Sequence, residues 1–263
     1  VTPSTQGQPS ALPVPAAAAP AAQTIRPVEA VLAEGNRIPI ETPALSGSIN
    51  LVGARIDDIT LTKYRQSIDK DAPPVRLFAP GGTQAAYFAS IGWSAQDIAV
   101  PGVATMWTAN GAKLTPETPV TLSWTNGTGQ TFRIEYSIDE HYLITAKQTI
   151  ANMGPAAVSA SSYALIDRLG KPTDPHEQDS ITIHVGPTGY LDGKSVFDTD
   201  YDDLEEAPSR TVRYNSAGWL GFTDKYWLAA IVPAKGERVT AAMSSPAANN
   251  YQTLFARDFR QIA

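Results

Sequence analysis

A chain of 263 residues, of which 43% are hydrophobic and 17% charged, has enough apolar material for one large β-domain or two small domains. Its formal net charge of -6, with no run of lysine and arginine, excludes the basic surface that nucleic-acid binding requires and opposes adsorption to anionic lipids. The absence of cysteine excludes disulfide bonds, thiol nucleophiles and thiolate metal sites.

The first 36 residues differ in composition from the rest. Residues 1–36 carry several prolines among alanine, serine, threonine and glutamine, a composition that cannot bury enough surface to offset the entropy of ordering. We therefore predict a disordered Pro/Ala-rich tether, with a short helical patch at residues 28–36; an added leader is the alternative. Because the chain begins with Val1 and lacks a signal-peptide pattern, we expect a removed signal or anchor, or an excised fragment.

Residues 37–263 are expected to form the domain itself, since short runs of β-branched and aromatic residues alternate there with glycine, proline, asparagine and aspartate. The clearest unit is a hairpin of Val120–Trp124 and Thr131–Ile138, because apolar residues alternate in both runs and Asn126-Gly127 suits a tight turn. Further strands are expected at Ile49–Leu51, Arg55–Leu61, Val75–Phe78, Tyr142–Ile150, Ser162–Asp167, Ile181–Val185, Trp227–Val232 and Val239–Met243.

Helical patterns are few, with single turns expected at Ser94–Ile98 and Asp202–Ala207. A dozen or so strands without alternating helices favour an all-β antiparallel sandwich. The apolar run Trp227–Val232 ends at Pro233, far short of the roughly 18 residues of a membrane-spanning helix. We therefore expect no direct membrane insertion by this chain.

The acidic run at residues 198–206 is the strongest candidate for a metal site. A calcium loop starting at Asp198 needs glycine at its sixth position and glutamate at its twelfth, where this chain has Asp203 and Ser209. We interpret the run as a solvated acidic loop. His176-Glu177 lacks the second histidine of a zinc helix, and neither a Gly-x-Ser-x-Gly elbow nor a Gly-Lys-Ser/Thr phosphate loop occurs. No catalytic residue, metal or cofactor is predicted.

The aromatic residues leave other functions open. Five tryptophans and ten tyrosines in a β-sandwich are compatible with a carbohydrate-binding or aldose epimerase-like protein of the cell envelope. Asp139-Glu140-His141 and Asp167-Arg168 supply carboxylates, but the sequence brings no two of them together. Core packing is the expected role of most of the tryptophans. A structural domain that spaces other modules is the third hypothesis.

Several strings resemble one family. They are Arg37–Leu51, Gly53–Ile59 with Lys63–Arg65, Tyr87-Phe-Ala with Gly92-Trp93, Leu114–Trp124, and the most specific one, Gly218-Trp-Leu-Gly-Phe-Thr-Asp-Lys-Tyr-Trp227. In this order they resemble the large periplasmic domain of the YidC membrane protein insertase.

The resemblance implies a β-supersandwich of the galactose mutarotase type in the periplasm, tethered to the bacterial inner membrane. It implies an accessory, non-catalytic role, because insertion in that family belongs to a core of transmembrane helices outside this chain. The implied partners are that insertase core of the same protein, the SecDF accessory complex of the translocon and client membrane proteins. It also implies further strands and a linking helix after Ala263.

A partner surface is first sought around Trp219, Tyr226 and Trp227. Aromatic residues anchor protein interfaces when they are exposed, and this string concentrates them beside glycine. The alternative is that these residues fill the core, since Leu220 and Phe222 alternate with Gly221 as in a buried strand.

Overall fold

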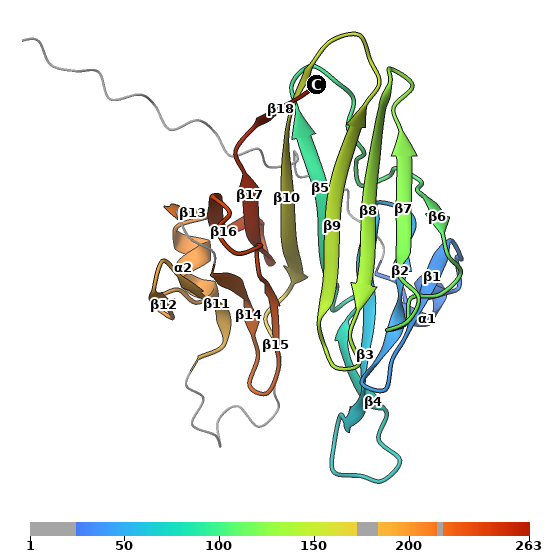
Figure 1. Ribbon diagram of the computed structural model, residues 1–263. Helices are drawn as coiled ribbons and strands as arrows, with labels where there is room; N and C mark the ends of the chain where they lie inside the picture. Colours follow the sequence, from blue (N-terminus) through green and yellow to red (C-terminus); the bar gives the residue numbers. More distant parts are fainter. Residues whose placement is uncertain (1–24, 173–183, 215–217) are drawn as a thin grey trace, which may run out of the picture.

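The computed structural model describes residues 25–172, 184–214 and 218–263 (Figure 1). These residues form eighteen strands, β1 to β18, and two short helices, α1 (Val28–Leu32) and α2 (Tyr201–Glu206). All paired strands of the three sheets run antiparallel, so the predicted all-β antiparallel class is confirmed. Neither helix in the described ranges has the length or hydrophobicity to cross a bilayer.

The largest sheet has ten strands in the order β1-β2-β3-β5-β10-β17-β16-β13, with β4 added on β3 and β18 on β10. Its strands are β1 (Arg37–Glu41), β2 (Leu45–Asn50), β3 (Arg55–Arg65), β4 (Pro74–Phe78), β5 (Tyr87–Ala95), β10 (Val158–Leu169), β13 (Ser209–Tyr214), β16 (Val239–Ala247), β17 (Asn250–Arg257) and β18 (Arg260–Ile262).

Two four-stranded sheets accompany the large one. The first, in the order β6-β7-β8-β9, contains β6 (Thr108–Asn110), β7 (Val120–Thr125), β8 (Gln130–Ile138) and β9 (Ile144–Asn152). The second, in the order β12-β11-β14-β15, contains β11 (Gly186–Leu191), β12 (Lys194–Val196), β14 (Trp219–Thr223) and β15 (Leu228–Ile231). Figure 1 shows them as separate green and orange groups.

The hairpin of β7 and β8 follows directly from the sequence pattern. Phe132, Ile134 and Tyr136 are fully buried, and the residues between them are less buried, as the alternation predicts. The turn contains Gly127 at φ 80°, a left-handed conformation that glycine adopts without strain. The predicted hairpin is therefore confirmed.

Aromatic contacts join each small sheet to the large one. On the β6–β9 side, Trp93 of β5 lies 6.2 Å from Trp107 and 5.3 Å from the Phe132 ring, centroid to centroid. On the β11–β15 side, Phe222 of β14 packs against Tyr87 of β5, with centroids 6.3 Å apart. Both interfaces belong to one apolar core, so the three sheets form a single two-layer sandwich.

The other predicted elements have mixed outcomes. The strands predicted around β2, β3, β4, β9, β10, β15 and β16 are confirmed, as are helical segments near 28–36 and 202–207. The helical turn predicted at Ser94–Ile98 is wrong, because Ser94 and Ala95 still belong to β5 and pair with Ser161 and Ala160 of β10. The predicted strand Ile181–Val185 lies mostly outside the described residues, as does His176.

The acidic run and the last part of the predicted tether each have a defined contact. At α2, the Asp200 side chain accepts from the Asp203 N–H at 2.9 Å, and an Asp203 oxygen accepts from the Asp200 N–H at 2.8 Å. The interpretation of the acidic run as a loop is therefore wrong for residues 201–206, which form a capped helix. Of the predicted tether, residues 1–24 lie outside the described residues. The Arg26 N–H donates to the Gly82 carbonyl at 3.0 Å, which attaches the segment before β1 to the domain.

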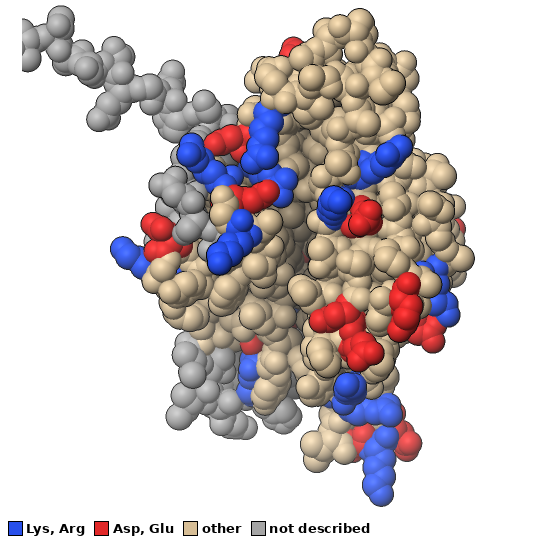
Figure 2. Space-filling model, viewed as in Figure 1, with Lys and Arg blue, Asp and Glu red and all other residues tan. Residues whose placement is uncertain are grey.

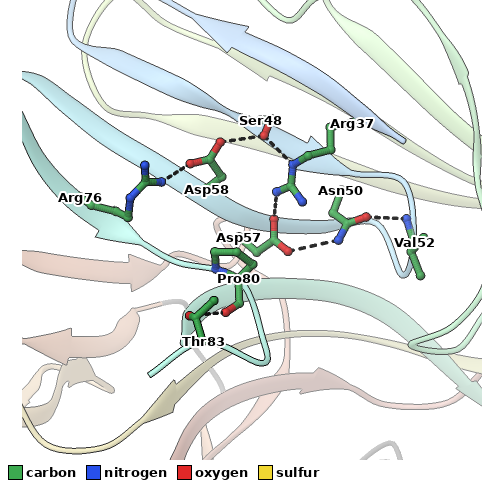
Figure 3. A network of polar contacts seen from close by, with 9 residues as sticks. All are labelled: Arg37, Ser48, Asn50, Val52, Asp57, Asp58, Arg76, Pro80 and Thr83. Atoms are coloured by element: carbon green, nitrogen blue, oxygen red, sulfur yellow. Dashed lines mark hydrogen bonds and ion pairs between the residues drawn. The ribbon is translucent and has the colours of Figure 1, made fainter. Parts of the chain in front are cut away.

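Charged residues are buried where β1, β2 and β3 meet (Figure 3). Asp57 is 1% exposed and forms an ion pair with Arg37, and Asn50 Nδ2 donates to its second oxygen at 3.2 Å. Arg37 Nε also donates to Ser48 at 2.7 Å. These bonds satisfy a carboxylate that would otherwise be costly to bury.

Replacing Asp57 with alanine tests this network. The Asp57→Ala substitution leaves the Arg37 guanidinium buried without its counterion, so we expect the free energy of unfolding to fall by about 3–5 kcal/mol. Urea denaturation of the variant measures the change. Asp71→Ala, in the exposed β3–β4 loop, is the control and should change stability by less than about 0.5 kcal/mol. Equal effects of the two substitutions would contradict the assignment.

Candidate partner-binding groove

An apolar groove runs between the two small sheets. It has a volume of about 580 Å³, which lies within the range of roughly 300–1,000 Å³ typical of ligand sites. One wall contains the first half of β9, and the other contains β15 and the segment that follows it. Figure 2 shows a shaded hollow between the two halves of the molecule, with mostly uncharged residues along it. We call this feature the β9/β15 groove.

The floor of the β9/β15 groove is the face of the large sheet beneath it. Ile91 pairs with Ala164, and Ala89 pairs with Ile166, so these four side chains share one face of β5 and β10. They are aliphatic and uncharged. Any bound group would therefore meet a flat, apolar surface at the bottom of the groove.

The end of one strand and two turns bring aromatic rings together at one end of the groove. Tyr64 comes from the end of β3, Tyr142 from the β8–β9 turn and Trp227 from the β14–β15 turn. The Tyr64 and Trp227 rings meet edge to face, with centroids 5.0 Å apart and an interplanar angle of 70°. Desolvation, together with the neighbouring Tyr64 hydroxyl, raises the pKa of Tyr142. The three rings therefore form one aromatic rim.

The opposite end of the groove is polar. Glu237 and Arg257 form an ion pair there. Gln148 Nε2 donates to the Gly92 carbonyl of β5 at 2.7 Å, which holds β9 against the large sheet. Among the described lining residues, Glu237 is the single carboxylate and Arg257 the single cation, so the groove has little net charge.

A buried ion pair fixes the β14–β15 turn that presents Trp227. Arg168 Nη1 donates to Asp224 at 2.6 Å, and the guanidinium lies 4.6 Å from the centroid of the Tyr87 ring. The Asp224 N–H in turn donates to the Trp227 carbonyl at 2.7 Å. Burial raises the pKa of Tyr87 far above its usual value, so this ring stays neutral beneath the cation. The turn is thus anchored to the core.

The three residues proposed from the sequence occupy different places. Tyr226 is 73% exposed at the tip of the β14–β15 turn, and Trp227 lines the groove beside it. Trp219 lies at the other end of β14, half-buried, and is outside the groove lining. Leu220 and Phe222 between them are buried in the core. The structure therefore groups Tyr226 and Trp227 and separates Trp219 from them.

Sequence reasoning did not find the other exposed apolar residues of the groove. These are Tyr64, Tyr142, Leu143, Leu228 and Val232. A signal existed for two of them, because Leu228 and Val232 belong to the continuously apolar run Trp227–Val232, whereas a strand with one buried face alternates apolar and polar residues. No local signal identifies Tyr64 or Tyr142, since they become neighbours only when the end of β3 meets the β8–β9 and β14–β15 turns.

The described residues contain no candidate metal site. No group of three or more His, Asp or Glu side chains within the described ranges is placed to hold a metal ion.

The fold and the groove define the class of this chain as a large antiparallel β-sandwich domain with an apolar groove between its two covering sheets.

The chain belongs to the YidC periplasmic domain family, whose model matches residues 37–263. It is 40% identical over 210 residues to the membrane protein insertase YidC of Zymomonas mobilis, and 43% identical over 220 residues to that of Rhizobium etli. It is also 39% identical over 248 residues to that of Bradyrhizobium diazoefficiens. The matches cover 80%, 82% and 93% of this chain, respectively.

The chain spans only 36%, 36% and 39% of the length of these three relatives. The family resemblance predicted from the sequence is confirmed, and so is the assignment to a periplasmic domain. The remaining length of the relatives lies outside the region of similarity, so the activity of a whole insertase is not a property that this chain demonstrates.

Removal of the turn anchor gives a direct test of the groove wall. The Asp224→Ala substitution leaves Arg168 buried without a counterion, so we expect a loss of about 3 kcal/mol in the free energy of unfolding. Amide hydrogen exchange should also become faster at residue 224, whose N–H donates to the Trp227 carbonyl, and at Ala229, which pairs with Phe222, because the turn loses its attachment. Lys225→Ala, in the same turn, keeps the buried pair and is the control. If exchange in the turn were unchanged in Asp224→Ala, the anchor would be refuted.

Proposed function

We propose that this chain is a non-catalytic accessory domain of a membrane protein insertase, and that it holds client membrane proteins through the β9/β15 groove. The observation that supports the proposal most is the open apolar groove with an aromatic rim in a member of this family. The domain would aid insertion and folding at the inner membrane. The transmembrane insertase core of the same protein and the SecDF accessory complex would be its other partners.

The lining of the groove favours a polypeptide over a sugar. Glycoside chemistry uses two carboxyl groups, and Glu237 is the single carboxylate among the described lining residues, engaged with Arg257. Aliphatic residues of β9, β15 and the floor provide most of the surface, with Tyr64 and Trp227 packed against each other at the rim. This surface suits apolar side chains better than the hydroxyl groups of a saccharide.

Weak binding is sufficient for such a role. A domain joined to the insertase is held near each client at a high effective concentration, so a shallow groove is occupied even when its intrinsic affinity is low. Low affinity also allows release, which an insertion aid requires. The groove therefore does not need the deep polar contacts of an enzyme site.

Two exposed residues of the β15 wall provide the test. Leu228 is 49% exposed and Val232 is 65% exposed, so glutamates at both positions should not disturb the core. In a full-length insertase with this domain, we expect the Leu228→Glu, Val232→Glu double variant to retain a stalled nascent inner-membrane protein several-fold less than the parent. Co-purification of the radiolabelled nascent chain measures this.

The matched control changes apolar residues that are exposed elsewhere. Val103→Glu with Met153→Glu adds the same charge at positions outside the groove lining. This control should retain the nascent chain as the parent does. If the two double variants behaved alike, the groove would not be the client-binding surface.

A further inference from the structure

Both walls of the β9/β15 groove are edge strands. β9 is the last strand of the sheet β6-β7-β8-β9, and β15 is the last strand of the sheet β12-β11-β14-β15. Within residues 25–172, 184–214 and 218–263, no strand pairs with the outer side of either one. An edge strand presents backbone N–H and C=O groups that have no hydrogen-bond partner within the sheet. The groove therefore offers hydrogen-bonding groups as well as apolar surface.

The register of β9 shows which of its residues point their backbone groups into the groove. The Asp139 N–H donates to the Leu143 carbonyl at 3.1 Å before the strand, and the Met153 N–H donates to the Gly129 carbonyl at 2.9 Å after it. Hydrogen-bonded and non-bonded pairs alternate along an antiparallel ladder. Every second residue of β9, beginning with Ile144, therefore directs its N–H and C=O away from β8.

The residues selected in this way include those that line the groove. Ile144, Ala146 and Gln148 are lining residues, and all three belong to the set whose backbone faces away from β8. None of these three is charged or proline, although charges and prolines commonly protect free edges. Lys147, the one charged residue of β9, is exposed and does not line the groove. The wall opposite shelters this edge from other sheets and leaves it open to a single extended chain.

The β15 wall repeats the arrangement on a smaller scale. The hydrogen bond from Asp224 to Trp227 closes the turn, so the next pair, Thr223 with Leu228, is a non-bonded pair. By the same alternation, Leu228 and Ala230 direct their backbone groups away from β14. Both are exposed lining residues.

The edge of β1 shows how this chain closes a free edge. The Glu41 N–H donates to the Leu114 carbonyl at 3.0 Å, and the Leu114 N–H donates to the Pro39 carbonyl at 2.9 Å. A loop residue thus pairs with the outer side of β1. Among the described residues, β9 has no equivalent cover over Ile144–Gln148, although it is a longer strand.

We propose that the groove takes an extended, apolar and uncharged segment of a client polypeptide, which adds to β9 as a new strand. This inference rests on the client-binding function proposed above. Main-chain hydrogen bonds to Ile144, Ala146 and Gln148 provide affinity independent of sequence, and alternate side chains of the client point to the floor of β5 and β10. The five residues from Ile144 to Gln148 extend for about 17 Å, so β9 would pair with a client segment of about five residues.

Amide hydrogen exchange on the full 263-residue chain tests the proposal. The probe is a capped synthetic peptide with valine at every second position, threonine between the valines and lysine at each end. At saturation, we expect exchange at the Ile144, Ala146 and Gln148 amides to slow by at least tenfold. The Thr145 and Lys147 amides already bond to β8 and should not change. Equal protection of these two sets of amides, or protection of neither set, would refute strand addition.

Two controls separate the alternatives. A peptide of the same composition, with its valines spaced for one face of a helix, should protect the alternate amides much less; equal protection would overturn the specificity for extended chains. If the Ile144, Ala146 and Gln148 amides were protected without peptide, and more so at higher chain concentration, the occupant would be a second copy of this chain. That result would refute the proposal. Peptide binding without amide protection also refutes it, but leaves the proposed function intact, because the Leu228 and Val232 variant tests the groove separately.

Discussion

The arrangement of this domain depends on one constraint: two separate small sheets, rather than one continuous sheet, cover one face of a ten-stranded sheet. Each small sheet is fastened by its own aromatic contacts, around Trp93 and Phe132 on one side and around Phe222 and Tyr87 on the other. Where β9 and β15 face each other, no described strand joins them. The central strands β5 and β10 therefore form the floor of an open groove instead of a closed core.

The same architecture makes the groove rigid at its floor and adjustable at its rim. Floor residues such as Ile91 and Ala164 belong to paired central strands, which are the least mobile elements of a sheet. The rim is built from the end of β3 and two turns, and one of these turns is fixed by the pair of Arg168 and Asp224. A rigid floor lowers the entropy that binding costs, while exposed rim side chains such as Tyr64 and Tyr142 can adapt to different client side chains. Such a surface suits a protein that meets many sequences.

Much of the fold was predictable because its signals are local. The β7–β8 hairpin and α2 have clear periodicity and turn or cap residues, and both were found. β5 was missed because Gly92 interrupts its apolar run; a Cβ at this position would come within 2.5 Å of the Tyr163 hydroxyl of β10, so the glycine reflects a contact between distant strands. The groove has the same origin. Tyr64, Tyr142 and Trp227 lie far apart in the sequence, and only the pairing of the sheets brings them together. The family strings identified the domain without revealing this surface.

The central claim is that clients contact the domain inside the β9/β15 groove. Site-specific photo-cross-linking in membranes tests it most directly, with the cross-linker at Ala230 in a full-length insertase and a stalled nascent inner-membrane protein as the target. The account predicts a strong cross-link from Ala230 and none above background from Val103, which is exposed outside the groove lining. Equal cross-linking from both positions, or cross-linking from Val103 alone, would contradict it.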